Sequence, residues 1–98
     1  MNVTFAADDL DRLETDPSFD MGLAEGIVRA YRKCLQIIWS AADERDFYAL
    51  KSLHFEKLKG KRQHQHSMRL NGQFRLVMEL DRGKGSKRVT IVGVEDYH

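Results

Sequence analysis

Two alternating segments on either side of Asn71-Gly72 constrain the fold more than any other feature of the chain. Apolar and polar residues alternate within 63–70 and again within 74–80, which is the period of a strand with one buried face. An Asn-Gly pair between such segments favours a tight hairpin. A two-residue loop would mix apolar and polar residues on both faces, whereas a loop over residues 71–73 makes one face wholly apolar. The sequence therefore predicts an antiparallel hairpin with a three-residue loop.

This register also places two like charges opposite each other. It pairs Met68 with Leu76 on the apolar face and Arg69 with Arg75 on the other face. Like charges that face each other across two strands destabilise a sheet, unless an anion lies between them. We therefore expect a phosphate-binding site between Arg69 and Arg75.

The first half of the chain has the period of helices. Residues 2–6 alternate enough for a short opening strand, and Asp8-Asp9 offers an N-cap for a short helix that ends at Pro17 and Ser18. Apolar residues then recur at the spacing of one helix face: Met21, Ala24, Ile27, Val28, Tyr31, Cys34, Leu35 and Ile38. We expect a long helix there, whose other side carries three solvated basic residues: Arg29, Arg32 and Lys33.

Two more segments complete the expected fold. Residues 43–50 read as a loop or a short helical turn, and residues 89–94 are apolar on both faces, as in a central strand. A chain of 98 residues has room for one domain with one core. The expected fold is therefore a single domain over residues 1–98 that combines helices with a small sheet.

Charge is distributed unevenly along the chain. Residues 51–90 hold eleven Lys or Arg and three acidic residues, a local balance of +8, although the whole chain has a net charge of +1. Residues 1–50 hold five basic and ten acidic residues. Because a basic surface supplies the sequence-independent part of phosphate binding, we expect such a surface on the second half.

The composition excludes several classes of protein. A hydrophobic content of 42% together with 32% charged residues of both signs argues against a disordered chain. Cys34 is the single cysteine, so it cannot form an intrachain disulfide, and we expect it to be buried as a small hydrophobe. No segment resembles a signal peptide or approaches the ~18 apolar residues of a membrane span. The expected location is a reducing cytoplasm.

Three motifs are more specific than these patterns. Leu58-Lys59-Gly60 follows Glu56 at a spacing of two residues, residues 69–75 read Arg-Leu-Asn-Gly-Gln-Phe-Arg, and the chain ends in Glu95-Asp96-Tyr97-His98. With these motifs the sequence resembles the HigB branch of the RelE/ParE superfamily of bacterial toxins, also called plasmid-maintenance killer proteins. The resemblance covers nearly the whole chain.

The resemblance implies a fold, an activity and partners. The fold would be α+β and RelE/ParE-like, with N-terminal helices packed on a small mixed, mostly antiparallel β-sheet. Toxins of this branch cut mRNA bound in the ribosome, and they are silenced by a HigA-like helix-turn-helix antitoxin. No cofactor and no metal are implied. The pair would bind operator DNA only through the antitoxin complex, and no membrane partner is expected.

The ending of the chain offers groups that move protons. Metal-independent cleavage of RNA requires a base for the ribose 2′-OH, cations for the phosphorane and an acid for the leaving 5′-oxygen. His98 is the best proton carrier, because a histidine titrates near pH ~6.5. Asp96 would orient His98 or share the role of base, and Tyr97 would donate a hydrogen bond or stack on a nucleobase.

The cations and a second candidate base lie earlier in the chain. Arg69 and Arg75 would clamp the phosphorane. Members of the family often have a histidine or an acid two residues before the Leu-Lys-Gly element, which makes Glu56 a candidate base. The sequence leaves open whether His98, Asp96 or Glu56 is the base. The further candidates for RNA or phosphate binding are Lys57, Lys59, Lys61 and Arg62.

Three other histidines receive no catalytic role. His54 stands two residues before the slot that carries a catalytic histidine in some family members, so that role is not transferred to it. His64 and His66 alternate along a predicted strand, and two histidines without a third ligand are a weak metal signal. We expect His64 and His66 to be surface residues near RNA.

Three classes of function remain open from the sequence. The first is a ribosome-dependent endoribonuclease, which the Asp96-Tyr97-His98 ending and the paired arginines favour. The second is a non-catalytic ParE-like toxin that binds a protein target such as gyrase and needs no terminal imidazole. The third is a plain RNA-binding module, for which the basic surface would suffice.

Overall fold

The computed structural model describes residues 1–81 and 87–96, and its five strands form one sheet in the order β1-β5-β4-β3-β2. The first part of the chain supplies strand β1 and the three α-helices: β1 (Asn2–Phe5), α1 (Asp8–Thr15), α2 (Glu25–Ser40) and α3 (Arg45–Ala49). The second part supplies two 3₁₀ helices and four strands: η1 (Lys51–Leu53), β2 (Glu56–Lys57), η2 (Gly60–Arg62), β3 (Gln65–Arg69), β4 (Phe74–Asp81) and β5 (Arg88–Asp96).

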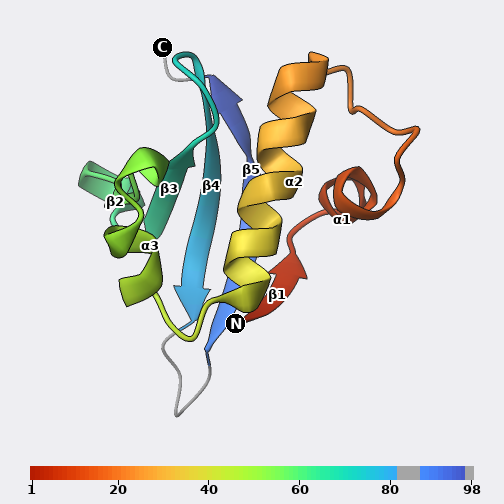
Figure 1. The fold of residues 1–98 in the computed structure, drawn as a ribbon. Helices are drawn as coiled ribbons and strands as arrows, with labels where there is room; N and C mark the ends of the chain where they lie inside the picture. The colour runs from red at the N-terminus through yellow and green to blue at the C-terminus, as the bar shows by residue number, and fades with distance from the viewer. Residues whose placement is uncertain (82–86, 97–98) are drawn as a thin grey trace.

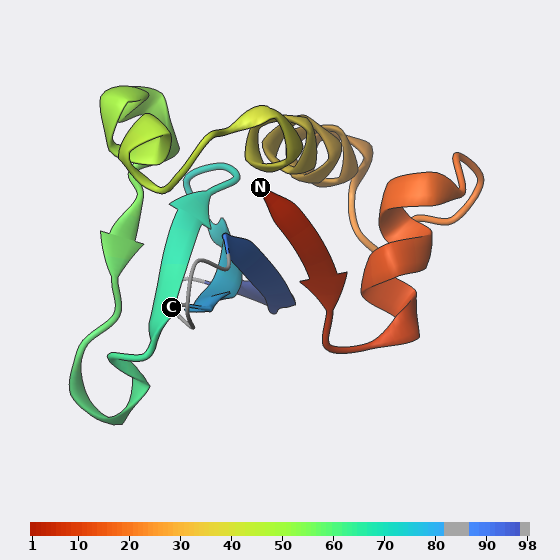
Figure 2. The same cartoon turned by 90° about the horizontal axis from the view of Figure 1, so that it is seen from below.

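The sheet is mixed and mostly antiparallel, as expected. β1 pairs with β5 in parallel, and the pairs β5-β4, β4-β3 and β3-β2 are antiparallel. α2 and α3 lie on the same side of this sheet, and α1 lies beyond β1 (Figure 1 and Figure 2). β5 has a neighbouring strand on each side, so it is the central strand that the sequence predicts for residues 89–94.

The β3–β4 hairpin has the predicted register. Met68 pairs with Leu76 and Arg69 with Arg75, and the N–H of Leu70 donates to the carbonyl of Phe74 at 2.9 Å. The loop is held by the side chain of Asn71, whose Oδ1 accepts hydrogen bonds from two backbone N–H groups, those of Gln73 and Phe74, at 2.8 and 2.7 Å. A side chain that satisfies two turn donors explains why asparagine begins this loop.

The core lies between α2 and one face of the sheet. Met68, Leu76 and Met78 point to this face and are fully buried. From α2 the core receives the predicted helix face: Val28, Tyr31, Cys34, Leu35 and Ile38. Tyr31 donates its hydroxyl proton to the carbonyl of Leu10 at 2.7 Å, and burial raises the pKa of this phenol. Burial likewise raises the pKa of the Cys34 thiol to about 11, so the expectation that Cys34 is buried is confirmed.

The N-termini of α1 and α2 differ from the sequence expectation. Asp8 and Asp9 lie within the first turn of α1, and the N-cap is Ala7, which makes no side-chain capping bond. The two carboxylates therefore act on the helix dipole instead of on single N–H groups. α2 begins at Glu25 and not near Met21, because Met21 and Gly22 have positive φ angles of 56° and 74° that a right-handed helix does not allow.

No helix among the described residues is long and apolar enough to cross a membrane.

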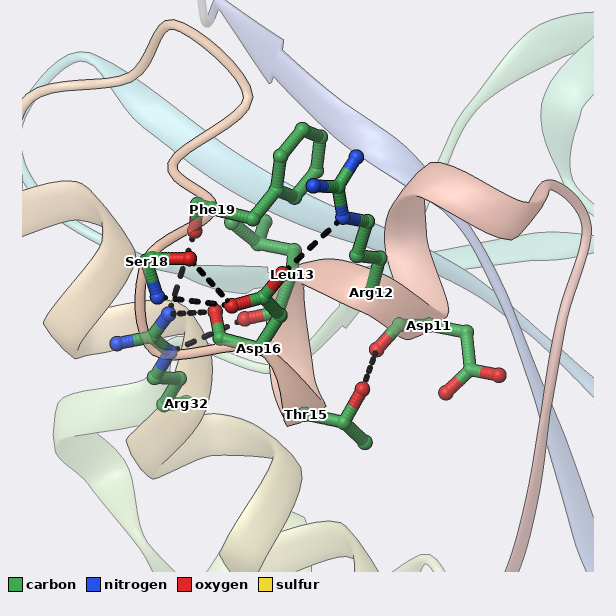
Figure 3. A network of polar contacts seen from close by, with 8 residues as sticks. All are labelled: Asp11, Arg12, Leu13, Thr15, Asp16, Ser18, Phe19 and Arg32. Carbon is green, nitrogen blue, oxygen red and sulfur yellow. Dashed lines mark hydrogen bonds and ion pairs between the residues drawn. The ribbon is translucent and has the colours of Figure 1, made fainter.

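Arg32 joins α2 to the segment that follows α1. Its Nε donates to the carbonyl of Leu13 at 3.0 Å, and its Nη2 donates to the carbonyls of Asp16 and Phe19 at 3.0 and 3.3 Å (Figure 3). The Asp16 carboxylate in turn accepts from both the N–H and the hydroxyl of Ser18. The expectation that Arg32 is a solvated residue is therefore wrong. Its guanidinium binds the carbonyl of Leu13, which lies in the last turn of α1 where helix geometry leaves carbonyls without intrahelical partners, and two carbonyls of the segment that follows α1.

Replacing Arg32 by Ala should lower the free energy of unfolding by about 1–3 kcal/mol, because hydrogen bonds from a charged donor are worth more than neutral ones. Urea unfolding followed by circular dichroism measures the effect. Lys33→Ala is the matched control, since Lys33 neighbours Arg32 on α2 and is exposed. If Arg32→Ala and Lys33→Ala lowered the free energy of unfolding equally, the structural role of Arg32 would be contradicted.

Candidate functional site

The candidate site lies on the open face of the sheet, defined here as the face opposite α2. Because successive strand residues point to opposite faces, Arg69 and Arg75 point away from the core that receives Met68 and Leu76. Glu56 pairs with Ser67 across β2 and β3, so it shares the open face. Ser67 is 2% exposed and its partner Val77 is fully buried, which gives this face a closed floor.

A first hollow lies at the hairpin end of the open face. It has a volume of about 280 Å³ and is lined by His54, Glu56, Ser67, Arg69, Asn71 and Gly72. His54 adopts the left-handed conformation, with φ 46° and ψ 48°, where η1 ends. Such a conformation costs free energy in a non-glycine residue and is often found at functional sites. The first hollow thus brings an imidazole, a carboxylate and a guanidinium together.

A second hollow adjoins the first and is more basic. It has a volume of about 380 Å³ and is lined by Glu56, Lys57, Leu58, Lys59, Arg62 and Arg75. Glu56 lines both hollows. The structure therefore brings five of the predicted basic residues together around the carboxylate of Glu56. They are Lys57, Lys59, Arg62, Arg69 and Arg75. Lys61, a further predicted phosphate ligand, is exposed on η2 and is not in the lining of either hollow.

An ion network crosses the open face beside the second hollow. The two Nη atoms of Arg62 donate to the two carboxylate oxygens of Glu95 at 2.9 and 2.6 Å, and Nε of Arg62 donates to Gln65 at 2.9 Å. The Glu95 carboxylate also lies 3.8 Å from Nη2 of Arg75. The hydrogen bonds from Arg62 lower the pKa of Glu95 below its usual value, against a partial burial that raises it.

The two opposed arginines do not share one anion position. Their backbone register is the predicted one, but Arg69 lines the first hollow and Arg75 the second. Arg69 donates from Nε to the carbonyl of Asn71 at 3.2 Å, and Arg75 has Glu95 beside it. The expected repulsion between the two guanidinium groups is thus relieved by local acceptors, and each arginine faces a different part of the site.

The end of the chain is described as far as Asp96. Asp96 is exposed, pairs with Phe74 at the end of the sheet, and accepts a hydrogen bond from Nε2 of Gln73 at 3.0 Å. Tyr97 and His98, which the sequence predicts to be catalytic, lie outside the described residues. Among the candidate bases, the structure places Glu56 between the hollows and Asp96 beside the hairpin loop.

The histidines in and before β3 differ from each other. His66 is 6% exposed and stacks on the ring of Phe55, with the centroids 5.0 Å apart. The prediction that His66 is a surface residue is therefore wrong, because its strand position points to the α2 side. His64 is exposed, and its Nε2 lies 3.8 Å from Oε2 of Glu79. No cluster of three potential metal ligands occurs within 1–81 and 87–96.

Sequence reasoning missed three residues that the structure brings into the site. Ser67 alternates with Arg69 along β3, so the strand period alone could have indicated it. His54 and Glu95 had no such signal. The position of His54 in the first hollow depends on the turn at the end of η1. Glu95 reaches Arg62 across a sequence separation of 33 residues.

Comparison with known proteins assigns the family. Residues 3–94 match the family model of HigB-like toxins, described as the RelE-like toxin of the type II toxin-antitoxin system HigB. The chain belongs to this family. No curated protein matches it significantly.

Solved structures share the fold of this HigB-like toxin. A YoeB/ParE toxin from Agrobacterium tumefaciens has a TM-score of 0.60 at 15% identity, with each chain covered in full. The YoeB-YefM complex from Staphylococcus aureus has a TM-score of 0.62 at 20% identity, covering 100% of this chain and 97% of the other. A heterotetrameric YoeB-YefM toxin-antitoxin complex from the same organism has a TM-score of 0.59 at 22% identity, with the same coverage. These similarities confirm the α+β, RelE/ParE-like fold.

Replacing Glu95 by Gln should make the stability of the HigB-like toxin less sensitive to acid. Since Arg62 lowers the pKa of Glu95 in the folded state, the carboxylate contributes stability that is fully present above the unfolded pKa of about 4.3 and is lost as the pH falls through the lower folded value. The advantage of the parent over the Gln variant should thus shrink as the pH falls below about 4.3.

Urea unfolding between acidic and neutral pH measures this dependence. Glu25→Gln is the control, because Glu25 and Arg29 form an exposed ion pair on α2 of a kind that contributes little to stability. A constant difference between the parent and Glu95→Gln at every pH would contradict the role of the ion network.

Proposed function

We propose that this HigB-like toxin is a ribosome-dependent endoribonuclease that cleaves mRNA by attack of the ribose 2′-OH, without a metal. The observation that carries the proposal is the position of Glu56, which lines both hollows of the open face. Arg69 lies in the first hollow and Arg75 in the second. In the proposed reaction the carboxylate can accept a proton from the ribose. The flanking guanidinium groups can stabilise the negative charge that develops on the neighbouring phosphate.

The proposed chemistry divides into three roles. Glu56 accepts the proton of the 2′-OH, and the oxygen formed attacks the adjacent phosphorus in line with the leaving 5′-oxygen. Arg75, Lys59 and Arg62 stabilise the phosphorane from the second hollow, because fixed cations cost no reorganisation as its charge develops. His98 donates a proton to the leaving oxygen, with Asp96 orienting it and Tyr97 stacking on a base. These terminal roles rest on the sequence motif and its family.

Arg62 can serve RNA without leaving Glu95. A guanidinium has five N–H donors, and three of those of Arg62 are taken by Gln65 and Glu95. No residue within 1–81 and 87–96 accepts from the two remaining N–H groups, which leaves them for phosphate oxygens. Glu95 therefore fixes the orientation of Arg62, and phosphate binding does not require the ion pair to break. Lys57, Lys61 and Arg69 add positive charge along the RNA backbone.

An antitoxin is the proposed regulator. The matched structures include complexes of YoeB with YefM, and the family model describes a toxin of a type II system. We assign to this chain a HigA-like helix-turn-helix antitoxin that silences it, and the pair reaches operator DNA through the antitoxin. Since its proposed targets, mRNA and translating ribosomes, are cytoplasmic, the toxin acts in the cytoplasm.

Mapping of mRNA 5′ ends in cells after induction tests the reaction. The parent should create new ends inside translated reading frames, and a transcript without its start codon should stay intact. Glu56→Gln should reduce the cuts by about 10²–10⁴-fold, the usual contribution of a general base. Glu79→Gln is the control, because Glu79 has the same chemistry on the same face, bonds to Gln65 and is not in the lining of either hollow.

Each outcome of this map identifies one class of function. Cuts confined to translated frames support the endoribonuclease. Growth arrest of cells whose mRNA is uncut would point to a ParE-like protein target. Neither cuts nor growth arrest would leave a plain RNA-binding module. Equal cutting by the Glu56→Gln and Glu79→Gln variants would remove Glu56 from the role of base.

Replacing His98 by Ala should abolish growth arrest without lowering the melting temperature, because the role proposed for His98 is proton transfer to the leaving oxygen and not packing. Growth after induction and thermal unfolding of the purified variant measure the two effects separately. Antitoxin binding should also be retained. Growth arrest at equal expression would show that His98 is dispensable.

A further inference from the structure

A third hollow lies on the other side of β2, next to α3. It has a volume of about 480 Å³ and is lined by Tyr48, Lys57, Gln63, His64, His66 and Leu80. Lys57 pairs with His66 and therefore points to the α2 side of the sheet, away from Glu56. The first and second hollows belong to the open face, whereas the third hollow lies on the α2 side and shares Lys57 with the second.

The three hollows follow one another around the β2 edge of the sheet. Glu56 lines the first and second hollows, and Lys57 lines the second and third. β2 is the last strand of the sheet, and α3 lies above this edge on the helix side (Figure 2). A single strand of RNA bound at Glu56 can therefore continue past Lys57 and around the edge without crossing the core of the molecule.

Tyr48 is the aromatic wall of the third hollow. It is 53% exposed, and its ring meets that of Phe55 edge to face at 4.9 Å. Phe55 is itself fixed between two further rings, since Phe47 lies 5.1 Å away and His66 stacks on it at 5.0 Å. A half-exposed ring held by a buried aromatic cluster loses little conformational freedom when a ligand stacks on it.

We propose that the third hollow binds a nucleobase of the RNA strand, next to the nucleotide that is cleaved at Glu56, by stacking on Tyr48. Lys57 meets the phosphate between the two nucleotides, and the exposed imidazole of His64 lies in the same wall. Aromatic rings beside a basic track are the usual way of binding single-stranded RNA. The proposal deepens the endoribonuclease assignment and rests on it for the identity of the ligand.

Titration of the purified toxin with a short, single-stranded oligoribonucleotide carrying 2′-O-methyl groups tests the proposal, because that RNA cannot be cleaved. Amide NMR shifts measure the Kd even when binding is weak. Tyr48→Ala and Tyr48→Leu should weaken binding by about five- to hundredfold, the range of one base stacked on an aromatic ring. Tyr48→Leu still covers Phe55, which keeps the test valid if the Ala variant is unstable.

Two controls separate stacking from other effects. Tyr48→Phe keeps the ring and should bind within twofold of the parent. Trp39→Ala removes another half-exposed aromatic residue, which is 48% exposed and bonded to Glu14, and it should leave the Kd unchanged. An abasic oligomer of the same length should bind the parent and the Tyr48→Leu variant equally, because it has no base to stack.

The remaining outcomes overturn the proposal in different ways. A Kd within twofold of the parent for both Tyr48→Ala and Tyr48→Leu would remove the base site and leave the reaction at Glu56 in place. Loss of antitoxin binding in these variants with unchanged RNA binding would assign Tyr48 to the antitoxin. A parent that binds no RNA would overturn the base site together with RNA recognition at the whole β2 edge.

Discussion

The register of the β3–β4 hairpin is the constraint on which the rest of the structure depends. A loop of three residues, fixed by the two hydrogen bonds that Asn71 accepts, directs Met68 and Leu76 to α2 and Arg69 and Arg75 to the open face. A slip of one strand by one residue would turn that strand over, mix apolar and polar residues on both faces, and bury one of the two guanidinium groups in the core. The same alternation that forms the core thus forms the basic surface.

The basic surface is stable because its charges are balanced locally. Glu95 accepts two hydrogen bonds from Arg62 and lies near Arg75, so part of the positive charge of the open face is neutralised within the fold. Among the described residues, no acceptor takes the two other N–H groups of Arg62, and Lys57 and Lys59 beside the second hollow are exposed. This arrangement keeps the cations oriented and limits the repulsion among them, as the proposed binding of a phosphate requires.

The proposed function and the proposed base site share the β2 edge. Edge strands expose backbone groups that can pair with other chains, and proteins often keep them short and charged. β2 has two residues, Glu56 and Lys57, and both are charged. In this toxin the residues that protect the edge also line the hollows, with Glu56 on the open face and Lys57 turned toward Tyr48.

The sequence by itself determined the hairpin register, the face of α2 that enters the core, the burial of Cys34 and the family, because each depends on a local period or a contiguous motif. It also predicted Glu56, Arg75 and Lys59 as site residues, and the structure brings these three together in the second hollow. Only the tertiary structure decided that Arg32 binds the carbonyls after α1, that His66 is buried against Phe55, and that Glu95 pairs with Arg62. These contacts join residues far apart in the chain, and whether a polar side chain meets water or a distant partner depends on how the elements pack, which no local pattern records.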